Sequence, residues 1–390
     1  MIQTLKKFAL PILIILGAIA TFQTARYADV SFYQLPHTGA VKPNAMSTDA
    51  PTYKIHKVVS DITPTVHSAT GVTLNNGNLL SMWYGGSREG HTDVALYSAV
   101  FDQNTQSWDK HQKVLDRYDA SDSLNRYIKK IGNPILVKHP QGPIVLIYVS
   151  VSLAGWATSH LNMAVSYDEG QTWHDSKRLV TTPFMNISML VKNDAVIYSD
   201  GTIGITAYHE LKGEFSEIVR VNLNGDVINQ YRMTSGTNTI QPTILVKNET
   251  DAIALLRDSS RHIQKVHFTE TKDAGKTWSA YEALDVKNPN SAVYGFSDTK
   301  NRSWMIFNDQ TRDVEFSRNN LALAVSDVSG RNWKTVHYFE NLEKTESLNA
   351  KYAYPWVITS TNNMFHLLYT VDREYIKHIE FNQTWLETLL

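Results

Sequence analysis

A turn that ends in tryptophan recurs along the chain at nearly constant spacing, and this repeat limits the possible folds more than any other feature. Its clearest copy, 166–173, has the pattern Ser-x-Asp-x-Gly-x-Thr-Trp, and 271–278 and 326–333 are close variants. Degenerate copies end at Trp108 and Trp385, and a turn at 221–225 stands where another would fall. The intervals are about 65, 55, 50, 55 and 52 residues. Such regularity indicates one structural unit repeated along the chain.

Pairs of β-type runs about a turn alternate with the tryptophan turns. They are 71–84, 133–149, 193–208, 241–257, 291–308 and 355–370. Each unit has room for four short strands, and no helical periodicity separates the units, which argues against parallel βαβ units. Repeats of about 40–50 residues with four strands are typical of a β-propeller. We therefore predict an all-β fold, a six-bladed β-propeller over 53–390.

The tryptophan turns themselves are interpreted as structural. Their Asp accepts backbone N–H bonds, their Gly takes positive φ, and their Trp packs between sheets. In a propeller the chemistry is expected where the innermost strands meet around the central channel, so the charged residues next to the paired runs are the candidates for function.

An apolar run at 8–22 precedes the repeats. Fifteen helical residues span roughly 22 Å, less than the ~30 Å hydrocarbon core of a bilayer. Small residues at 18 and 20 would suit a cleavage site. The sequence thus predicts export, with 1–27 as either a cleaved signal peptide or an uncleaved membrane anchor, and a Pro-bearing linker at 28–52. The expected location is the periplasm or the cell exterior, or the inner membrane if the segment stays attached.

Composition excludes several kinds of function. Lys and Arg number 37 against 38 Asp and Glu, so no electrostatic field favours nucleic acid. The chain has no cysteine, which excludes disulfides, thiolate metal sites and a cysteine nucleophile. Its 14 histidines are scattered, and no Gly-rich phosphate loop leads from a strand into a helix. No metal or cofactor is predicted.

The tryptophan turns are similar to the Asp-box (BNR) repeats of sialidases. Further segments stand in the order that this family shows: 84–93 after the first paired runs, 241–257, 288–291, 318–321 and 354–355. Together they resemble the predicted bacterial neuraminidase branch of the superfamily, from about residue 60 to the end of the chain.

This resemblance implies hydrolysis of a terminal acidic keto sugar. Asp93 matches the general acid, and Tyr354 matches the nucleophile. Arg257 and Arg318 match the second and third arginines that bind the sugar carboxylate, and Arg88 matches the arginine just before the acid. These residue types suit the chemistry. A guanidinium meets a carboxylate with two parallel bonds, and a tyrosine nucleophile avoids a second carboxylate beside an anionic sugar.

Two positions depart from the family pattern. His67 stands where sialidases carry an arginine, and Gln241 stands where they carry the glutamate that assists the tyrosine. With Gln241 there, Glu210 is the candidate base for Tyr354. His67 is expected to orient or bind the carboxylate. His91, two residues before the acid, is expected on the same strand face and able to share its task.

Structural roles compete with these assignments. Asp93 could cap a turn; as an acid it needs burial to raise its pKa. The arginines could be partners of nearby carboxylates: Arg257 with Asp258, Arg318 with Asp313, and Arg373 with Asp372. For Arg373 the structural pairing is the preferred interpretation.

Three functions remain open. The first is an exported exo-glycosidase that removes sialic acid, or the eight-carbon keto acid (Kdo) of lipopolysaccharide, from a glycoconjugate. The second is a lyase acting on a uronate polymer, with Tyr354 and a histidine abstracting a proton. The third is a propeller that binds carbohydrate without catalysis, which Gln241 in place of glutamate would permit.

Overall fold

The computed structural model describes residues 11–14, 16–17, 31–35, 50–58, 62–182, 186, 188–211, 213–314, 317–341, 349–360 and 363–390. Most of the predicted export segment lies outside them; 11–14 and 16–17 are helical. Within this part of the chain, no helix combines the length and the apolar character needed to cross a membrane.

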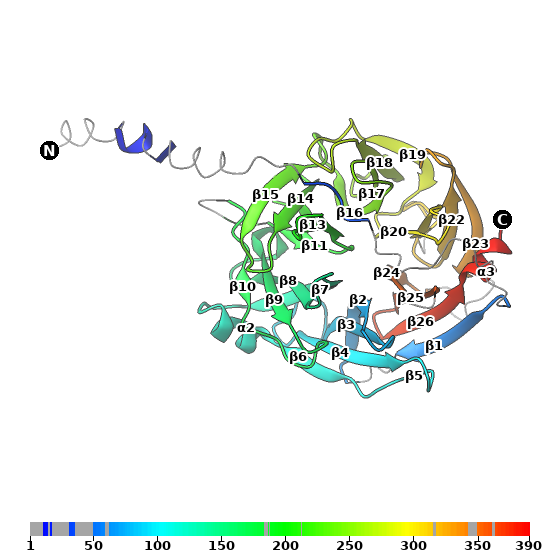
Figure 1. The fold of residues 1–390 in the computed structure, drawn as a ribbon, viewed down its shortest axis with the longest axis horizontal. Helices are drawn as coiled ribbons and strands as arrows, with labels where there is room; N and C mark the ends of the chain where they lie inside the picture. Colours follow the sequence, from blue (N-terminus) through cyan, green and yellow to red (C-terminus); the bar gives the residue numbers. More distant parts are fainter. Residues whose placement is uncertain are drawn as a thin grey trace.

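The described strands form six antiparallel sheets around a central axis, as Figure 1 shows. Five of these blades are built from consecutive strands. Blade 1 has β2 (Thr65–Thr73), β3 (Leu79–Gly86) and β4 (Ala95–Asp102), with β5 (Ser107–Trp108) and β6 (Gln112–Leu115) both on β4. Blade 2 has β7 (Lys130–Lys138), β8 (Ile144–Val151), β9 (Ser159–Ser166) and β10 (Lys177–Arg178). Blade 3 has β11 (Leu190–Val191) and β12 (Val196–Ile197) on β13 (Ile203–His209), then β14 (Phe215–Val221) and β15 (Val227–Arg232).

Blade 4 has β16 (Thr239–Val246), β17 (Ala252–Asp258), β18 (Lys265–Thr271) and β19 (Glu282–Lys287). Blade 5 has β20 (Tyr294–Ser297), β21 (Ser303–Phe307), β22 (Leu321–Ser326) and β23 (Trp333–Glu340). Blade 6 joins both ends of the domain: β24 (Tyr352–Thr359), β25 (Met364–Val371) and β26 (Tyr375–Asn382), with β1 (Tyr53–Val58) as its outer strand. The predicted six-bladed propeller is confirmed. Because β1 pairs with β26 in continuous register from Tyr53–Phe381 to Val58–Ile376, the ring is closed by backbone hydrogen bonds.

The tryptophan turns act as the sequence predicts. In the 271–278 turn, Asp273 accepts bonds from the backbone N–H of Thr277 (2.9 Å) and from two threonine hydroxyls. Trp278 Nε1 donates back to the Gly275 carbonyl at 3.0 Å. One degenerate copy was assigned wrongly: Trp385 lies on the short helix α3 (Gln383–Glu387), not in a turn. There it packs on Tyr53 and Phe381, which helps to seal blade 6.

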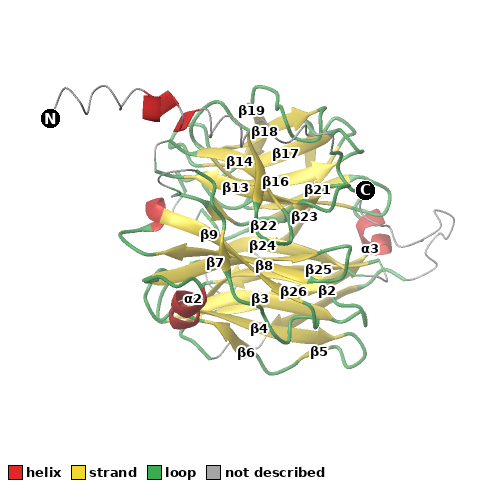
Figure 2. Ribbon diagram, turned by 60° about the vertical axis from the view of Figure 1, so that its left-hand side comes forward, coloured by secondary structure: helices red, strands yellow, loops and turns green. Residues whose placement is uncertain are grey.

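Side chains between the blades form the core. Its largest cluster runs through several blades and includes Trp83, Trp304 and Trp356, none more than 1% exposed. The helices lie at the periphery (Figure 2), with α2 (Arg117–Ser123) in the connection from blade 1 to blade 2.

Residues 31–35, inside the predicted linker, lie against blades 3 and 4. Backbone N–H groups of Tyr33 and Gln34 donate to the carbonyls of Glu249 and Ile197, both at 2.8 Å. The Tyr33 ring is 1% exposed and packs on Tyr198 at 5.2 Å between centroids.

Candidate active site

The topology brings the candidate residues to one face of the ring, which we call the upper face: the face at which the inner strands β2, β7, β16, β20 and β24 begin. Connections between the second and third strands of each blade reach the same face, because neighbouring strands are antiparallel. These connections carry the candidates Arg88 to Asp93 in blade 1, Glu210 in blade 3 and Arg318 in blade 5, while Arg257 stands next to last on β17 in blade 4.

A ring of unusual backbone conformations marks where the inner strands begin. One non-glycine residue per blade has a positive φ there: Ser68, Asn133, Ser188, Gln241, Asn290 and Tyr354, with φ of 57°, 41°, 66°, 51°, 58° and 55°. In four blades the residue lies at a register shift in the inner strand's ladder. Such conformations cost roughly 1–2 kcal/mol each and recur at functional sites, where a bulge redirects a side chain.

Tyr354 stands at the bulge of β24. Its ring stacks on His67 of β2, with centroids 4.2 Å apart and planes inclined by 16°. Its hydroxyl accepts a hydrogen bond from Gln241 Nε2 at 3.0 Å, and the same amide also reaches the Tyr208 hydroxyl at 3.3 Å. Gln241 therefore donates to the phenol oxygen, whereas a glutamate in its place would accept. Both residues at which the sequence departs from the sialidase pattern contact the predicted nucleophile.

Arg257 and Arg318 are tied into the same network. Arg257 donates to Gln241 Oε1 at 2.9 Å and to Asn290 Oδ1 at 2.7 Å. Arg318 donates to the backbone carbonyl of Asn290. Neither forms an ion pair with the carboxylates of the described residues, so the alternative that each serves a neighbouring aspartate does not hold.

Asp258 and Asp313, the two aspartates of that alternative, have other partners. Asp258 accepts from Ser260, Gln264 and His267, and Asp313 accepts from Gln264. The guanidinium groups of Arg257 and Arg318 thus keep unused donors for an anion.

Arg373 is the functional candidate that the sequence interpretation missed. The preferred pairing with Asp372 was wrong: Arg373 forms an ion pair with Glu89 of blade 1, and Asp372 caps the backbone N–H of Lys351. Arg373 lies in the connection between β25 and β26, the same second-to-third position that Arg318 occupies in blade 5. Position within the repeat was the signal that could have found it.

The pKa shifts show how closely these cations converge. Burial, with the charges of Arg373, Arg318, Lys192 and Arg257, holds the pKa of His67 well below its usual value. The His67 ring is therefore neutral at physiological pH, with Nδ1 3.0 Å from the Thr370 hydroxyl. Burial also lowers the pKa of Arg318 to about 10, with Arg257 and Arg373 adding to the effect. A site in which cations depress one another's pKa is suited to an anionic ligand.

Lys192 and Asn193 of blade 3 form a buried polar cluster next to Tyr354. Lys192, 1% exposed, donates from Nζ to Asn193 Oδ1 (2.8 Å) and to the carbonyl of Pro355. Asn193 Nδ2 lies 3.0–3.1 Å from the carbonyls of Gln241, Pro242 and Val293. The two side chains therefore hold the backbone in three other blades: at Gln241 in blade 4, at Val293 in blade 5 and at Pro355, next to Tyr354, in blade 6.

A carboxylate accompanies the buried lysine. Asp194 accepts a bond from the Tyr294 hydroxyl and lines a cavity of about 570 Å³ at the lower end of the channel. The Asp194 side chain is exposed to this cavity, but the blades that surround it raise the pKa of its carboxyl to about 7. Burial lowers the pKa of Lys192 to about 7.

Asp93 and His91 form a pair in the connection after β3, a loop instead of the expected strand. His91 Nδ1 lies 2.8 Å from Asp93 Oδ1, and Ser87 also bonds the carboxylate. Partial burial pushes the pKa of Asp93 upward, but the bonds from His91 and Ser87 outweigh it, so the pKa lies below its ordinary value. The expectation of a raised pKa is thus not met in the free protein. Arg88 is exposed and bonds no carboxylate of the described residues.

Glu210 approaches the network without joining it. Its backbone N–H donates to Ser188 Oγ at 2.8 Å, while its carboxylate makes no hydrogen bond to the described residues. Burial and then Glu214 raise its pKa, and Arg257 opposes them. A carboxylate with a raised pKa beside Arg257 suits a proton acceptor. Across the ranges described above, no cluster of three or more acidic or histidine side chains is arranged to hold a metal ion.

Fold and site together define a sialidase-like propeller with a cationic centre. A family model described as a BNR repeat-like domain matches residues 77–367, about three quarters of the chain. The chain belongs to this BNR repeat-like family, as the turns predicted. No curated protein matches the sequence.

Solved structures agree on the fold. A Hadza microbial sialidase, Hz136, matches with a TM-score of 0.66 and 16% identity, over 84% of this chain and 67% of that one. A protein of unknown function from Dyadobacter fermentans matches with a TM-score of 0.65 and 11% identity, over 85% and 100%. The intramolecular trans-sialidase from Ruminococcus gnavus, bound to oseltamivir carboxylate, matches with a TM-score of 0.62 and 12% identity, over 85% and 98%. At these identities the likeness concerns the fold.

Proposed function

We propose that this protein is an exported glycoside hydrolase that releases a terminal acidic keto sugar, sialic acid or a Kdo-like sugar, from a glycan or lipopolysaccharide. The observation that carries the proposal is the convergence of Arg257, Arg318 and Arg373 around Tyr354 at the upper end of the channel. Three guanidinium groups of which two lack a carboxylate partner among the described residues suit a ligand carboxylate.

In this proposal each group has one task. The arginines hold the sugar carboxylate while Tyr354 Oη attacks the anomeric carbon and its proton passes to Glu210. The bond to the leaving oxygen breaks, and that oxygen takes a proton from the His91–Asp93 pair. Water then cleaves the bond between tyrosine and sugar and gives a proton to the same pair, while the departing Tyr354 oxygen takes its proton back from Glu210. Gln241 donates to the tyrosine oxygen and stabilises it as a leaving group in this second step.

His67 takes a different role from the arginine that it replaces. Its neutral ring supports one face of Tyr354, and Arg373 supplies the third positive charge from blade 6. The carboxylate would therefore sit displaced toward blade 6, which favours an acidic sugar whose other substituents differ from those of sialic acid. Kdo, with a shorter chain, is the specific alternative.

The test is release of free sugar by the full-length protein from sialosides, Kdo-terminated oligosaccharides and uronate polymers. Tyr354→Phe should abolish release, and Arg318→Ala should weaken substrate binding by tenfold or more, since a charge-assisted bond is worth about 1.5–3 kcal/mol. Arg302→Ala is the matched control, because Arg302 is paired with Asp298 and Glu387 away from the channel. Release that survives Tyr354→Phe would reject the nucleophile. Ultraviolet absorbance from a new C=C bond would identify a lyase, and binding without release would identify a lectin-like propeller.

A further inference from the structure

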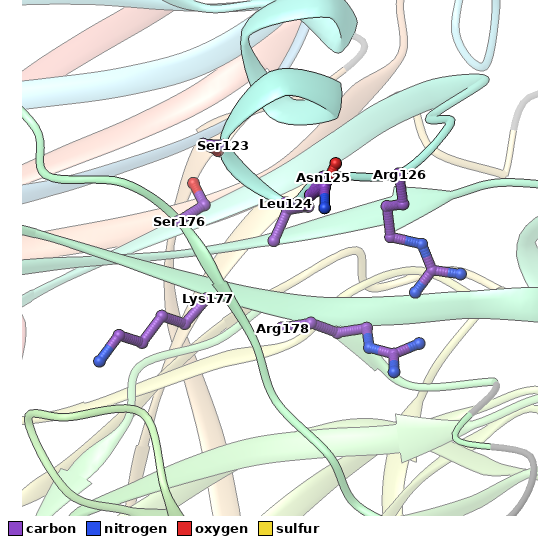
Figure 3. A pocket seen from close by; sticks show the side chains of 7 residues that line it. All are labelled: Ser123, Leu124, Asn125, Arg126, Ser176, Lys177 and Arg178. Carbon is purple, nitrogen blue, oxygen red and sulfur yellow. The ribbon is translucent and has the colours of Figure 1, made fainter.

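A second cationic pocket lies outside the network around Tyr354. It is a cavity of about 520 Å³ between the residues that follow α2 and the short strand β10. Figure 3 shows the guanidinium groups of Arg126 and Arg178 on the same side of this pocket, whereas Lys177 points to the opposite side. Lys177 has its own partner, the carbonyl of Asn224 at 3.0 Å.

The two guanidinium groups are not neutralised. Across the described part of the chain, neither side chain forms an ion pair or a hydrogen bond. Burial and the nearby charge of Arg178 lower the pKa of Arg126, and both arginines help burial to lower the pKa of His160. By contrast, Arg331, also on the outside of the ring, bonds two carboxylates, Glu270 and Glu282. Two like charges held together without a counter-charge are a feature that this pocket shares with the proposed active site.

Further polar groups line the same pocket. Asn125 and the hydroxyl-bearing Ser123 and Ser176 complete its wall. The Ser123 hydroxyl is buried and has no hydrogen-bond partner in the described structure. Hydroxyl, amide and guanidinium donors in one concave site are the groups that bind a carboxylate or sulfate on a saccharide.

The chain runs from this pocket to the surroundings of the Asp93 loop within a few residues. Gly90, three residues before Asp93, leaves room for Lys130 and Trp156: a Cβ there would lie 3.3 Å from Lys130 Nζ and 3.8 Å from the Trp156 ring. Lys130 Nζ lies 4.0 Å from the centroid of that ring. Arg126 precedes Lys130 by four residues, so their Cα atoms are at most about 14 Å apart.

The order of these groups around the ring gives the direction of the substrate. The arginines of the proposed site come from blades 4 to 6, and Asp93 comes from blade 1. A sugar held by those arginines, with its leaving oxygen beside Asp93, would direct the rest of the glycan over blades 1 and 2. There it meets Lys130 and the partly exposed Trp156, and then Arg126 and Arg178.

We infer that the Arg126–Arg178 pocket is an accessory subsite for a second acidic group on the leaving side of the glycan, so that the substrate class is an oligosaccharide with negative charge on more than one sugar. The direction of the chain in this inference rests on the proposed function. The existence of an anion site at the two arginines does not.

The experiment compares binding of monosaccharides and linked oligomers of sialic acid and of Kdo to full-length Tyr354→Phe protein by calorimetry. The oligomer should bind at least tenfold more tightly than its monosaccharide. Adding Arg126→Ala and Arg178→Ala together should remove that gain and leave monosaccharide affinity unchanged, while Lys177→Ala should change neither. An equal affinity for oligomer and monosaccharide, or a gain that survives the double substitution, would overturn the inference.

A second measurement separates this inference from the proposed function. Inorganic sulfate is titrated into the protein while the side-chain Nε–H signals of Arg126 and Arg178 are followed by NMR, assigned by their loss in the single Arg→Ala variants. Saturable shifts of both signals are expected, even if no monosaccharide binds at Tyr354. Signals that do not respond to sulfate would overturn the subsite, whatever the outcome at the active site.

Discussion

The buried Lys192 side chain contributes both to the stability of the protein and to the position of Tyr354. The structure gives an expected change in the free energy of unfolding when Lys192 is replaced by methionine. Methionine keeps the length of the side chain and removes its charge and its hydrogen bonds. The carbonyl of Pro355 and the side-chain oxygen of Asn193 would lose their bonds from Nζ. Leaving buried acceptors without partners costs about 1–3 kcal/mol each.

The charge itself works in the opposite direction. Burial lowers the pKa of Lys192 from 10.5 to about 7. A tenfold change in an acid dissociation constant corresponds to about 1.4 kcal/mol. Burying the protonated lysine therefore lowers the free energy of unfolding by on the order of 5 kcal/mol at pH 7 and below. The two effects are of similar size, and the net change in the free energy of unfolding near pH 7 should be small.

The pH dependence of the free energy of unfolding separates the effect of the buried charge from that of the hydrogen bonds. Between pH 8 and 10 the unfolded chain still binds the lysine proton and the folded chain does not, so the stability of the wild type rises with pH. The methionine variant lacks this contribution. The difference in the free energy of unfolding, wild type minus variant, should therefore increase by about 1.4 kcal/mol per pH unit in this range. In the wild type the pKa of Asp194 is raised to about 7, below this pH range.

Urea unfolding followed by tryptophan fluorescence at pH 6, 8, 9 and 10 measures this difference. Thr206→Val is the matched control. The Thr206 hydroxyl donates to the carbonyls of Asn193 and Asp194, beside Lys192, and it is not titratable in this pH range. Its cost, about 1–2 kcal/mol, should be constant across these pH values. A wild-type-minus-methionine difference that is level from pH 8 to 10, or that falls, would refute the argument from charge burial.

Three other changes have definite outcomes. Asp273→Ala should destabilise the protein by about 1–2 kcal/mol at pH 7, since it removes the bonds from Thr277. Partial burial raises the pKa of Asp273, but the bonds from Thr277 and Thr271 outweigh it and hold the pKa below its ordinary value. The contribution is therefore lost as pH falls through the folded-state pKa, and wild type and variant should converge in acid unfolding experiments. Tyr33→Ala should cost about 3 kcal/mol and expose the adjoining chain to protease, which limited proteolysis would detect; an unchanged midpoint would mean that the docked segment is dispensable. Gln241→Glu should turn the donor to the Tyr354 hydroxyl into an acceptor and add a carboxylate titration to the pH profile of turnover, whereas an unaltered profile would show that this contact does not take part.

The fold was predictable because its information is local and repeated. The Asp and Gly of the three clear tryptophan turns determine a tight turn within eight residues, and the spacing of the turns, together with the paired runs between them, predicted the number of blades. The closure by β1 was not predictable in the same way. Residues 53–58 carry no turn motif, and their partner strand, 375–382, lies at the other end of the sequence.

Site residues that match a motif position could be predicted from the sequence, whereas those whose role depends on neighbours in space could not. Arg257, Arg318, Tyr354 and Gln241 match motif positions, and the structure joins them in one hydrogen-bond network. Arg373 was assigned to its sequence neighbour Asp372, because adjacency is visible in a sequence and the convergence of blades 1 and 6 is not. The pKa of Asp93 depended on side chains that surround it in space, which residue type alone does not reveal.

The docked segment around Tyr33 determines where the N-terminal part of the chain meets the propeller. The carbonyls that receive this segment belong to Ile197, at the end of β12, and Glu249, just beyond the end of β16. Both lie on the lower face, opposite the face at which β16 begins and the arginines gather. Nine residues stand between Phe22 and Phe32, so these two residues are at most about 36 Å apart. If the apolar run at 8–22 is an uncleaved anchor, one of the two alternatives that the sequence leaves open, we propose that the lower face is turned toward the membrane. The upper face with its arginines would then be open to polysaccharides.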